Sequence, residues 1–181
     1  MLFGLVGSEM CIRDRSSRLN QVLSDVDIIY AEDTRVAKKL LSHLNLKKEV
    51  YSYFKGNEVK KIDEIIHFLN DGKSIAMISD AGTPLISDPG SMLVKELVKK
   101  NVNIISIPGP SSVLVALTLS GFDTDKFTFL GFIPRSGKER TKFFDDVRDT
   151  ELTLICFTSP NRLKKDPVSY THLTLPTSNG V

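Results

Sequence analysis

Three short segments carry the residue types best suited to chemistry. They read AEDTR at 31–35, SDAGTPLISDPG at 79–90 and PGPSS at 108–112. In the first, Glu32 or Asp33 could accept a proton, and a guanidinium stands beside them. The second combines glycine, threonine, proline and aspartate, which lets backbone amides approach a ligand without obstruction by side chains. The sequence therefore indicates a ligand-binding loop with acidic groups close to it.

Each segment also has a purely structural interpretation. Asp33 or Thr34 could cap the helix that follows. Ser111 or Ser112 could cap a later helix, and residues 79–90 could be a tight turn. The amino terminus of that later helix would also favour a polar or anionic ligand group. The second segment lacks the GxGxxG and GxxxxGKS/T patterns, which argues against a dinucleotide-binding fold and a P-loop.

A basic segment at 134–148, PRSGKERTKFFDDVR, is a fourth candidate. Its positive side chains could contact RNA phosphates, with Phe143 nearby for packing. They are Arg135, Lys138, Arg140 and Lys142. Glu139, Asp145 and Asp146 dilute the positive charge. The alternative is therefore a solvated loop and helix face.

The composition is that of a globular protein, with 41% hydrophobic and 25% charged residues among 181. A net charge of +2, from 24 basic and 22 acidic residues, is too small to indicate a nucleic-acid partner by itself. No apolar run approaches the roughly 20 residues of a membrane span, so we expect a cytoplasmic protein without a membrane partner. Cys11 and Cys156 predict no disulfide, and three histidines without paired spacing predict no metal site.

The order of the predicted elements explains how the three segments could share a site. Short β-branched runs predict strands at 26–31, 74–78 and 103–107. Apolar residues at helical spacing predict helices between them: Val36, Leu40, Leu41 and Leu44; Ile62, Ile65, Ile66 and Leu69; Leu93, Leu97 and Val98. Alternating strands and helices predict a parallel sheet covered on both faces. Because ligands bind at the carboxyl ends of such strands, the three segments should line one crevice.

Local signals refine the helix ends. Asp88 before Pro89 predicts an N-cap with proline at the first helical position. Gly72 predicts the end of the preceding helix.

Two α/β domains are expected. The first covers 16–108, and 109–166 begins the second, with Gly109-Pro110 as the hinge. In the second we predict a helix from about 112 to 119 and strands at 127–132 and 152–157.

Both ends of the chain lack the alternation of predicted strands and helices. Residues 1–15, MLFGLVGSEMCIRDR, have too short an apolar part for a signal sequence. Residues 167–181, PVSYTHLTLPTSNGV, carry no formal charge. Both resemble stray peptides that arise when adapter or vector DNA is translated. We interpret both ends as non-native and the chain as truncated.

The three segments and GFDTDKFTFLGFIPR at 121–135 resemble, in order and spacing, the bacterial small-subunit (16S) ribosomal RNA cytidine-2'-O-methyltransferase I family. That family belongs to the tetrapyrrole methylase superfamily, and the resemblance covers 16–166. It implies a two-domain α/β fold with a mainly parallel first sheet and a mixed second sheet. It further implies a homodimer that binds S-adenosyl-L-methionine between its domains and methylates a ribose 2'-hydroxyl of 16S rRNA in the small ribosomal subunit.

Site residues follow partly from this resemblance. Its motifs place cofactor contacts at Asp80, Ala81, Gly82, Thr83, Ile86, Ser111, Ser112, Val113, Phe157 and Thr158. Our hypothesis for catalysis rests instead on charge at a strand end, and it names Glu32, Asp33 and Arg35. For RNA phosphates it names Arg35, Arg135, Lys138 and Arg140.

The sequence also departs from the family pattern. MLFGLVGS stands where the family has a strand and a loop similar to PTPIGN, and YFKGNE at 53–58 replaces a stretch that often holds histidines. We therefore expect the 181-residue chain to bind the cofactor weakly and not to turn over. The competing hypotheses are a tetrapyrrole or precorrin methyltransferase, which the AEDTR and TDKFTFLGFIPR stretches match less well, and a non-catalytic RNA-binding module.

Overall fold

The structure, a computed structural model, describes residues 2–7, 16–80, 82, 84–162 and 166. The chain forms two compact units, Met1–Ser112 and Val113–Val181, and each is described by itself. Most of the two ends that we interpret as non-native, 8–15 and 167–181, lies outside the described residues.

The first unit is built on a five-stranded sheet in the order β3-β2-β4-β1-β5. All four strand pairs are parallel, as the alternation of strands and helices predicts. The elements along the chain are β1 (Leu2–Gly7), α1 (Ser17–Asp25), β2 (Ile28–Ala31), α2 (Thr34–His43), β3 (Glu49–Ser52), α3 (Glu58–Asn70), β4 (Ser74–Ser79), α4 (Ser91–Lys99) and β5 (Asn103–Ile107).

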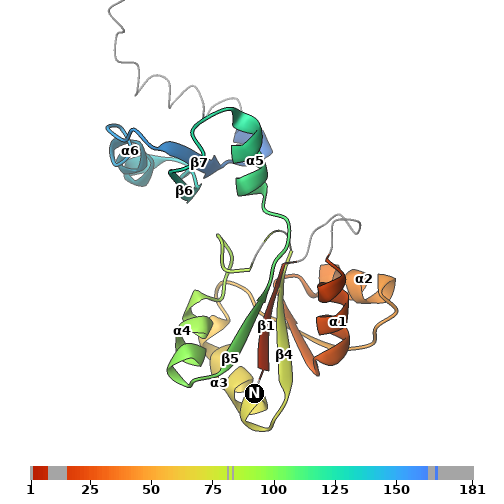
Figure 1. Ribbon diagram of the computed structural model, residues 1–181. Coiled ribbons are helices and arrows are strands. Elements are labelled where there is room, and N and C mark those ends of the chain that lie inside the picture. Colours follow the sequence, from red (N-terminus) through yellow and green to blue (C-terminus); the bar gives the residue numbers. More distant parts are fainter. Residues whose placement is uncertain (1, 8–15, 81, 83, 163–165, 167–181) are drawn as a thin grey trace, which may run out of the picture. The chain divides into compact units, whose positions relative to one another are not determined.

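Helices cover both faces of this sheet (Figure 1), with α1 and α2 on one side and α3 and α4 on the other. Neighbouring residues of a strand point to opposite faces. Tyr30 and Met77 therefore pack in the core with α3 and α4, whereas Ile29 and Ala76 pack with α1 and α2. Burial on both faces explains why the central strands are apolar throughout.

Strand β1 comes from the segment that we interpret as non-native. It pairs with both β4 and β5, and Phe3 and Leu5 are 0% and 7% exposed. A short apolar run that fills the place between two strands buries its side chains and satisfies its backbone, which is sufficient reason for pairing there. The pairing of β1 does not show where these residues come from, so their non-native origin stays a prediction.

The predicted helix ends are correct in two cases and wrong in one. Asp33 caps α2, and Gly72, with φ +80°, follows α3 and donates its N–H to the Leu69 carbonyl at 3.0 Å. Asp88 is not an N-cap, because α4 begins at Ser91 and its N-cap residue is Gly90. Left-handed backbone between β4 and α4 delays the entry into the helix.

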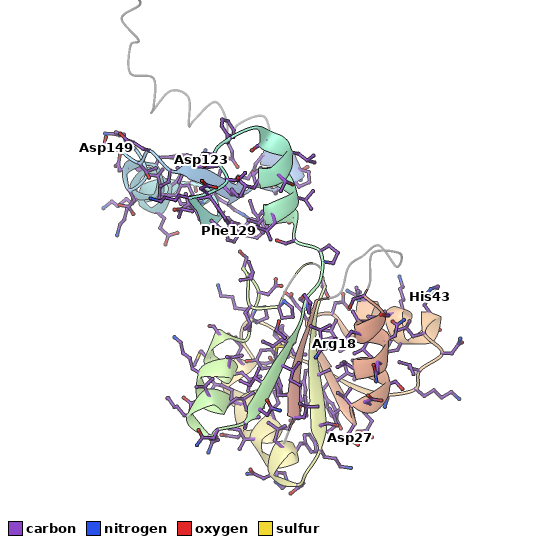
Figure 2. All side chains as sticks on the ribbon, in the orientation of Figure 1. Arg18, Asp27, His43, Asp123, Phe129 and Asp149 are labelled. Atoms are coloured by element: carbon purple, nitrogen blue, oxygen red, sulfur yellow. The ribbon has the colours of Figure 1, made fainter. Side chains whose placement is uncertain are left out.

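The second unit contains α5 (Ser112–Ser120), β6 (Phe127–Phe132), α6 (Gly137–Asp145), β7 (Thr153–Phe157) and a 3-10 turn at Pro160–Arg162. Its two described strands run parallel, with an irregularity between Phe129 and Phe132. Phe129, labelled in Figure 2, lies with its ring centroid 4.9 Å from that of Phe157. Within the described part of the chain, no helix is long and apolar enough to cross a membrane.

Candidate active site at the carboxyl edge of the first sheet

The three loops singled out in the sequence leave the same edge of the first sheet. Strands β2 and β4 are neighbours, with Ala31 opposite Ile78, so 31–35 and 79–90 begin side by side. Strand β5 lies beyond β1 in the same parallel sheet, so residues 108–112 also leave from the carboxyl edge. Such an edge is where open α/β sheets bind ligands.

Backbone hydrogen bonds tie these loops together. The Asp33 N–H donates to Oδ1 of Asp80 at 3.3 Å, which joins the loops after β2 and β4. The Tyr53 N–H donates to the Ala31 carbonyl at 2.8 Å, which adds the segment after β3. The structure thus brings Glu32, Asp33 and Asp80 together, as the sequence predicts for motifs at neighbouring strand ends.

Asp33 is bound to Arg35. Its carboxylate accepts hydrogen bonds from the backbone N–H of Arg35 at 2.8 Å, from Nε at 3.0 Å and from Nη2 at 2.6 Å. These bonds lower the pKa of Asp33 to about 2. A carboxylate held in this way is a weak proton acceptor, so the geometry favours the capping role of Asp33.

Two carboxylates beside this ion pair, Glu32 and Asp88, have a raised pKa, and the charge of Asp80 acts on both. Burial, and then the charge of Asp80, raises the pKa of Glu32 above its usual value. Burial, followed by the charges of Glu32 and Asp80, raises the pKa of Asp88 to about 6. Asp88 was not among the residues expected at the site, because an aspartate before Pro89 has a capping interpretation in the sequence.

Figure 2 offers a contrast at the opposite edge of the sheet, where Asp27 precedes β2. Its Oδ2 accepts hydrogen bonds from the N–H and hydroxyl of Ser74 at 2.8 and 2.9 Å. These bonds lower the pKa of Asp27. Asp27 is therefore a structural carboxylate, whereas burial and neighbouring negative charges make ionisation of Glu32 and Asp88 less favourable.

The loop between β4 and α4 has an unusual backbone. Leu85 and Ser87 take left-handed φ angles of 77° and 67°, which non-glycine residues seldom adopt. At Gly90, φ is +123°, which strains any other residue, and an added Cβ would lie 2.6 Å from Leu85 Cδ2 and displace that side chain. The Gly90 N–H donates to Oε1 of Glu58 at 3.0 Å, which fastens the loop to the start of α3. Strain of this kind concentrates at functional sites.

The expected cofactor contacts fall into three groups. In the first unit, Asp80 and Gly82 lie in the loop after β4, Ile86 is 51% exposed there, and Ala81 and Thr83 lie outside the described residues. Ser111 and Ser112 stand at the start of α5. Val113, Phe157 and Thr158 belong to the second unit, where Thr158 donates a hydrogen bond to Asp166. Contact of all three groups with one cofactor stays a prediction.

The residues expected to bind RNA differ in how they are held. Arg135 and Lys138 are exposed. Arg140 is 17% exposed, and its Nη1 lies 2.9 Å from Oδ1 of Asp166, a carboxylate that is only 2% exposed. The same nitrogen donates to the Pro134 carbonyl at 3.0 Å. Arg140 thus stabilises its own unit, so Arg135 and Lys138 are better placed for a phosphate.

Among the residues that the structure describes, no group of three or more His, Cys, Asp or Glu side chains could hold a metal ion.

Residues 16–167 match the family model described as Tetrapyrrole (Corrin/Porphyrin) Methylases. The chain belongs to this family. Curated relatives named Ribosomal RNA small subunit methyltransferase I include one from Halalkalibacterium halodurans and one from Thermotoga maritima. The first is 40% identical over 153 residues, which cover 84% of this chain and 53% of that protein. The second is 40% identical over 152 residues, which cover 84% and 68%. The chain thus spans about half the length of the first relative.

Solved structures confirm the tetrapyrrole-methylase-type fold. A diphthine synthase superimposes with a TM-score of 0.65 at 17% identity, over 88% of this chain and 65% of the other. A precorrin-6Y methylase from Archaeoglobus fulgidus gives a TM-score of 0.51 at 25% identity, over 72% and 64%. At these identities the similarity establishes the architecture alone, because one fold hosts many chemistries.

Proposed function

We propose that this protein transfers a methyl group from S-adenosylmethionine to the ribose 2'-hydroxyl of a cytidine in 16S ribosomal RNA. The observation that carries the proposal is the proximity of Glu32, in the loop after β2, to Asp80 and Asp88, in the strained loop after β4, at the carboxyl edge of the sheet. Similarity to relatives named as small-subunit rRNA methyltransferases supports it. The proposed partner is the small ribosomal subunit, and the proposed state is a cytoplasmic homodimer.

The described residues fit S-adenosylmethionine in chemical character. The cofactor carries a sulfonium and an ammonium group, which acidic surroundings stabilise. Asp80 supplies such a charge, and the exposed Ile86 offers an apolar surface for the adenine. Nothing lies within 4 Å of an ideal Cβ at Gly82, so the backbone there is open to a ligand. When bound, the cofactor supplies an electrophilic methyl group.

Glu32 is the proposed proton acceptor. The attacking 2'-hydroxyl must lose its proton, and a carboxylate with a raised pKa accepts it more readily. Asp33 is a poorer acceptor because Arg35 holds its charge. Arg35, Arg135 and Lys138 are the proposed contacts to RNA phosphates, since each is exposed.

The test is methyl transfer from labelled S-adenosylmethionine to small ribosomal subunits, with a porphyrinoid as the competing acceptor. The assay uses the 181-residue chain and a version extended to the length of the relatives. We expect the extended protein to label RNA, and the 181-residue chain to bind the cofactor weakly and not to turn over. Tight micromolar cofactor binding by the short chain would contradict the second expectation, and labelling of the porphyrinoid alone would contradict the proposed substrate.

A further inference from the structure

Tyr53 carries a buried hydroxyl without a hydrogen-bond partner among the described residues. The residue is 1% exposed, and burial, followed by the charge of Glu58, raises its pKa. A hydroxyl in that position bears a desolvation cost that folding does not recover. Such an unmet group points to a ligand or a functional role.

The position of Tyr53 is fixed on both sides. Its N–H donates to the Ala31 carbonyl at 2.8 Å, immediately before Glu32 in the chain. Asn57 bridges the flanking residues, because Nδ2 donates to the Ser52 carbonyl at 3.2 Å and Oδ1 accepts from the Phe54 N–H at 2.9 Å. These bonds hold the backbone, and the buried ring packs edge-on against the ring of Tyr30.

Tyr53 lines a small hollow together with the acidic groups of the candidate site. The other lining residues are Glu32, Met77, Ile78, Ser79, Pro84, Asp88 and Pro89. The hollow has a volume of about 10 Å³, which is room for one atom the size of a water oxygen. It can therefore receive a single polar atom of a larger ligand, but not a ring.

The groups around the hollow select the kind of atom that fits. The Tyr53 O–H needs an acceptor, whereas ionised Glu32 and Asp88 need donors. A phosphate or carbonyl oxygen only accepts and would face two carboxylates. An ammonium group only donates and would leave the tyrosine proton without a partner. A hydroxyl accepts from the tyrosine and donates to a carboxylate at the same time.

We propose that Tyr53, Glu32 and Asp88 form the binding site for the acceptor hydroxyl, with the Tyr53 Oη–H donating to the ribose 2'-oxygen and one carboxylate accepting the 2'-OH hydrogen. This inference rests on the proposed function, which supplies a ligand with such a hydroxyl. It adds Tyr53 as a positioning residue and Asp88 as a second carboxylate at the acceptor.

The test compares two RNA oligonucleotides that differ only at a central cytidine, which is 2'-deoxy in one. Affinities are measured for the unmodified chain, for Tyr53→Phe and for Tyr51→Phe. Tyr51 is the matched control, because its hydroxyl donates to Glu49 at 3.0 Å and does not line the hollow. We expect the unmodified chain and Tyr51→Phe to bind the ribose form about fivefold more tightly, the effect of one net hydrogen bond.

Tyr53→Phe should lose this preference without a lower melting temperature, because the deleted oxygen has no protein partner. Retained preference in Tyr53→Phe would overturn the inference and indicate that the hollow holds only water. Equal binding of both oligonucleotides by the unmodified chain would overturn it as well. Loss of the preference in Tyr53→Phe, together with no methyl transfer by the extended protein, would keep the site and reject the proposed reaction.

Discussion

Asp33 and Arg35, two residues apart at the start of α2, form a charged pair in which the guanidinium Nη2 lies 2.6 Å from Oδ2 of the carboxylate. Arg35 remains 86% exposed in its side chain. Arg35 neutralises Asp33 and makes it a weak proton acceptor. Glu32 is therefore the carboxylate of AEDTR with the higher affinity for a proton, because the charge of Asp80 acts on it.

Substitution of Glu32 should therefore affect catalysis much more than substitution of Asp33. In the extended protein, we expect Glu32→Gln to lower kcat for methyl transfer about 100-fold, the typical contribution of a positioned base. Asp33→Asn should lower it less than about fivefold, since asparagine also caps helices. Cofactor affinity, measured by calorimetry, should stay within about twofold in both. Equal losses in the two variants would reject Glu32 as the base.

Asp88 should make stability depend on pH in a predictable direction. Its folded pKa of about 6 exceeds the ordinary value of 3.8, so its protonation stabilises the fold. This stabilisation is fully present below pH 3.8 and is lost as the pH rises through about 6. Asp88→Asn should therefore gain in melting temperature relative to the unmodified chain between about pH 4 and pH 7. Glu32 and Asp80 face Asp88, and their charges act in the same direction. A difference that is constant across this pH range would contradict the assignment.

Gly90 should be indispensable for the loop after β4. We expect Gly90→Ala to cost about 2 to 3 kcal/mol of unfolding free energy in urea, because positive φ and a close approach to Leu85 act together. Gly72→Ala is the control, since its φ is also positive but nothing lies within 4 Å of the added Cβ. Its cost should be only about 1 kcal/mol. If both variants unfold alike, the packing of the loop against Leu85 is not as described.

Arg140 and Arg135 should separate stability from RNA binding. Arg140→Ala removes one partner of the buried Asp166, which keeps Arg162 and Thr158, so the second unit should lose about 1 to 2 kcal/mol of stability. Arg135→Ala should leave the melting temperature unchanged and weaken RNA binding. The slope of log affinity against log salt concentration should fall by about one, because one phosphate contact is lost. A destabilised Arg135→Ala, or an undisturbed Arg140→Ala, would reverse these two assignments.

The central part of the fold could be predicted from the sequence because burial leaves a pattern there. Strands β2 and β4 are buried runs of β-branched and apolar residues. By contrast, β3 (Glu49–Ser52) is a four-residue edge strand with a partly exposed pattern, and α1 (Ser17–Asp25) buries only Leu19 and Leu23. Strand β1 was missed because its residues were read as foreign to the chain.

The site residues that directly follow a predicted strand could be predicted from the sequence. Glu32 and Asp80 follow strands directly, so the parallel sheet alone brings them to one edge. Tyr53 could not be found in that way, because its burial depends on how the segment after β3 joins β2 through Ala31. Asp88 was assigned to a helix cap in the sequence because it precedes Pro89. The left-handed residues Leu85 and Ser87 instead delay the start of α4 to Ser91.

The most direct test of the account is the position of the methyl group after the reaction. Small ribosomal subunits are treated with labelled S-adenosylmethionine and the extended protein, and their 16S RNA is digested to nucleosides for mass spectrometry. The account predicts the label on the ribose 2'-oxygen of a cytidine, with strong loss in Glu32→Gln. Label on a base, or RNA that stays unlabelled, would contradict it.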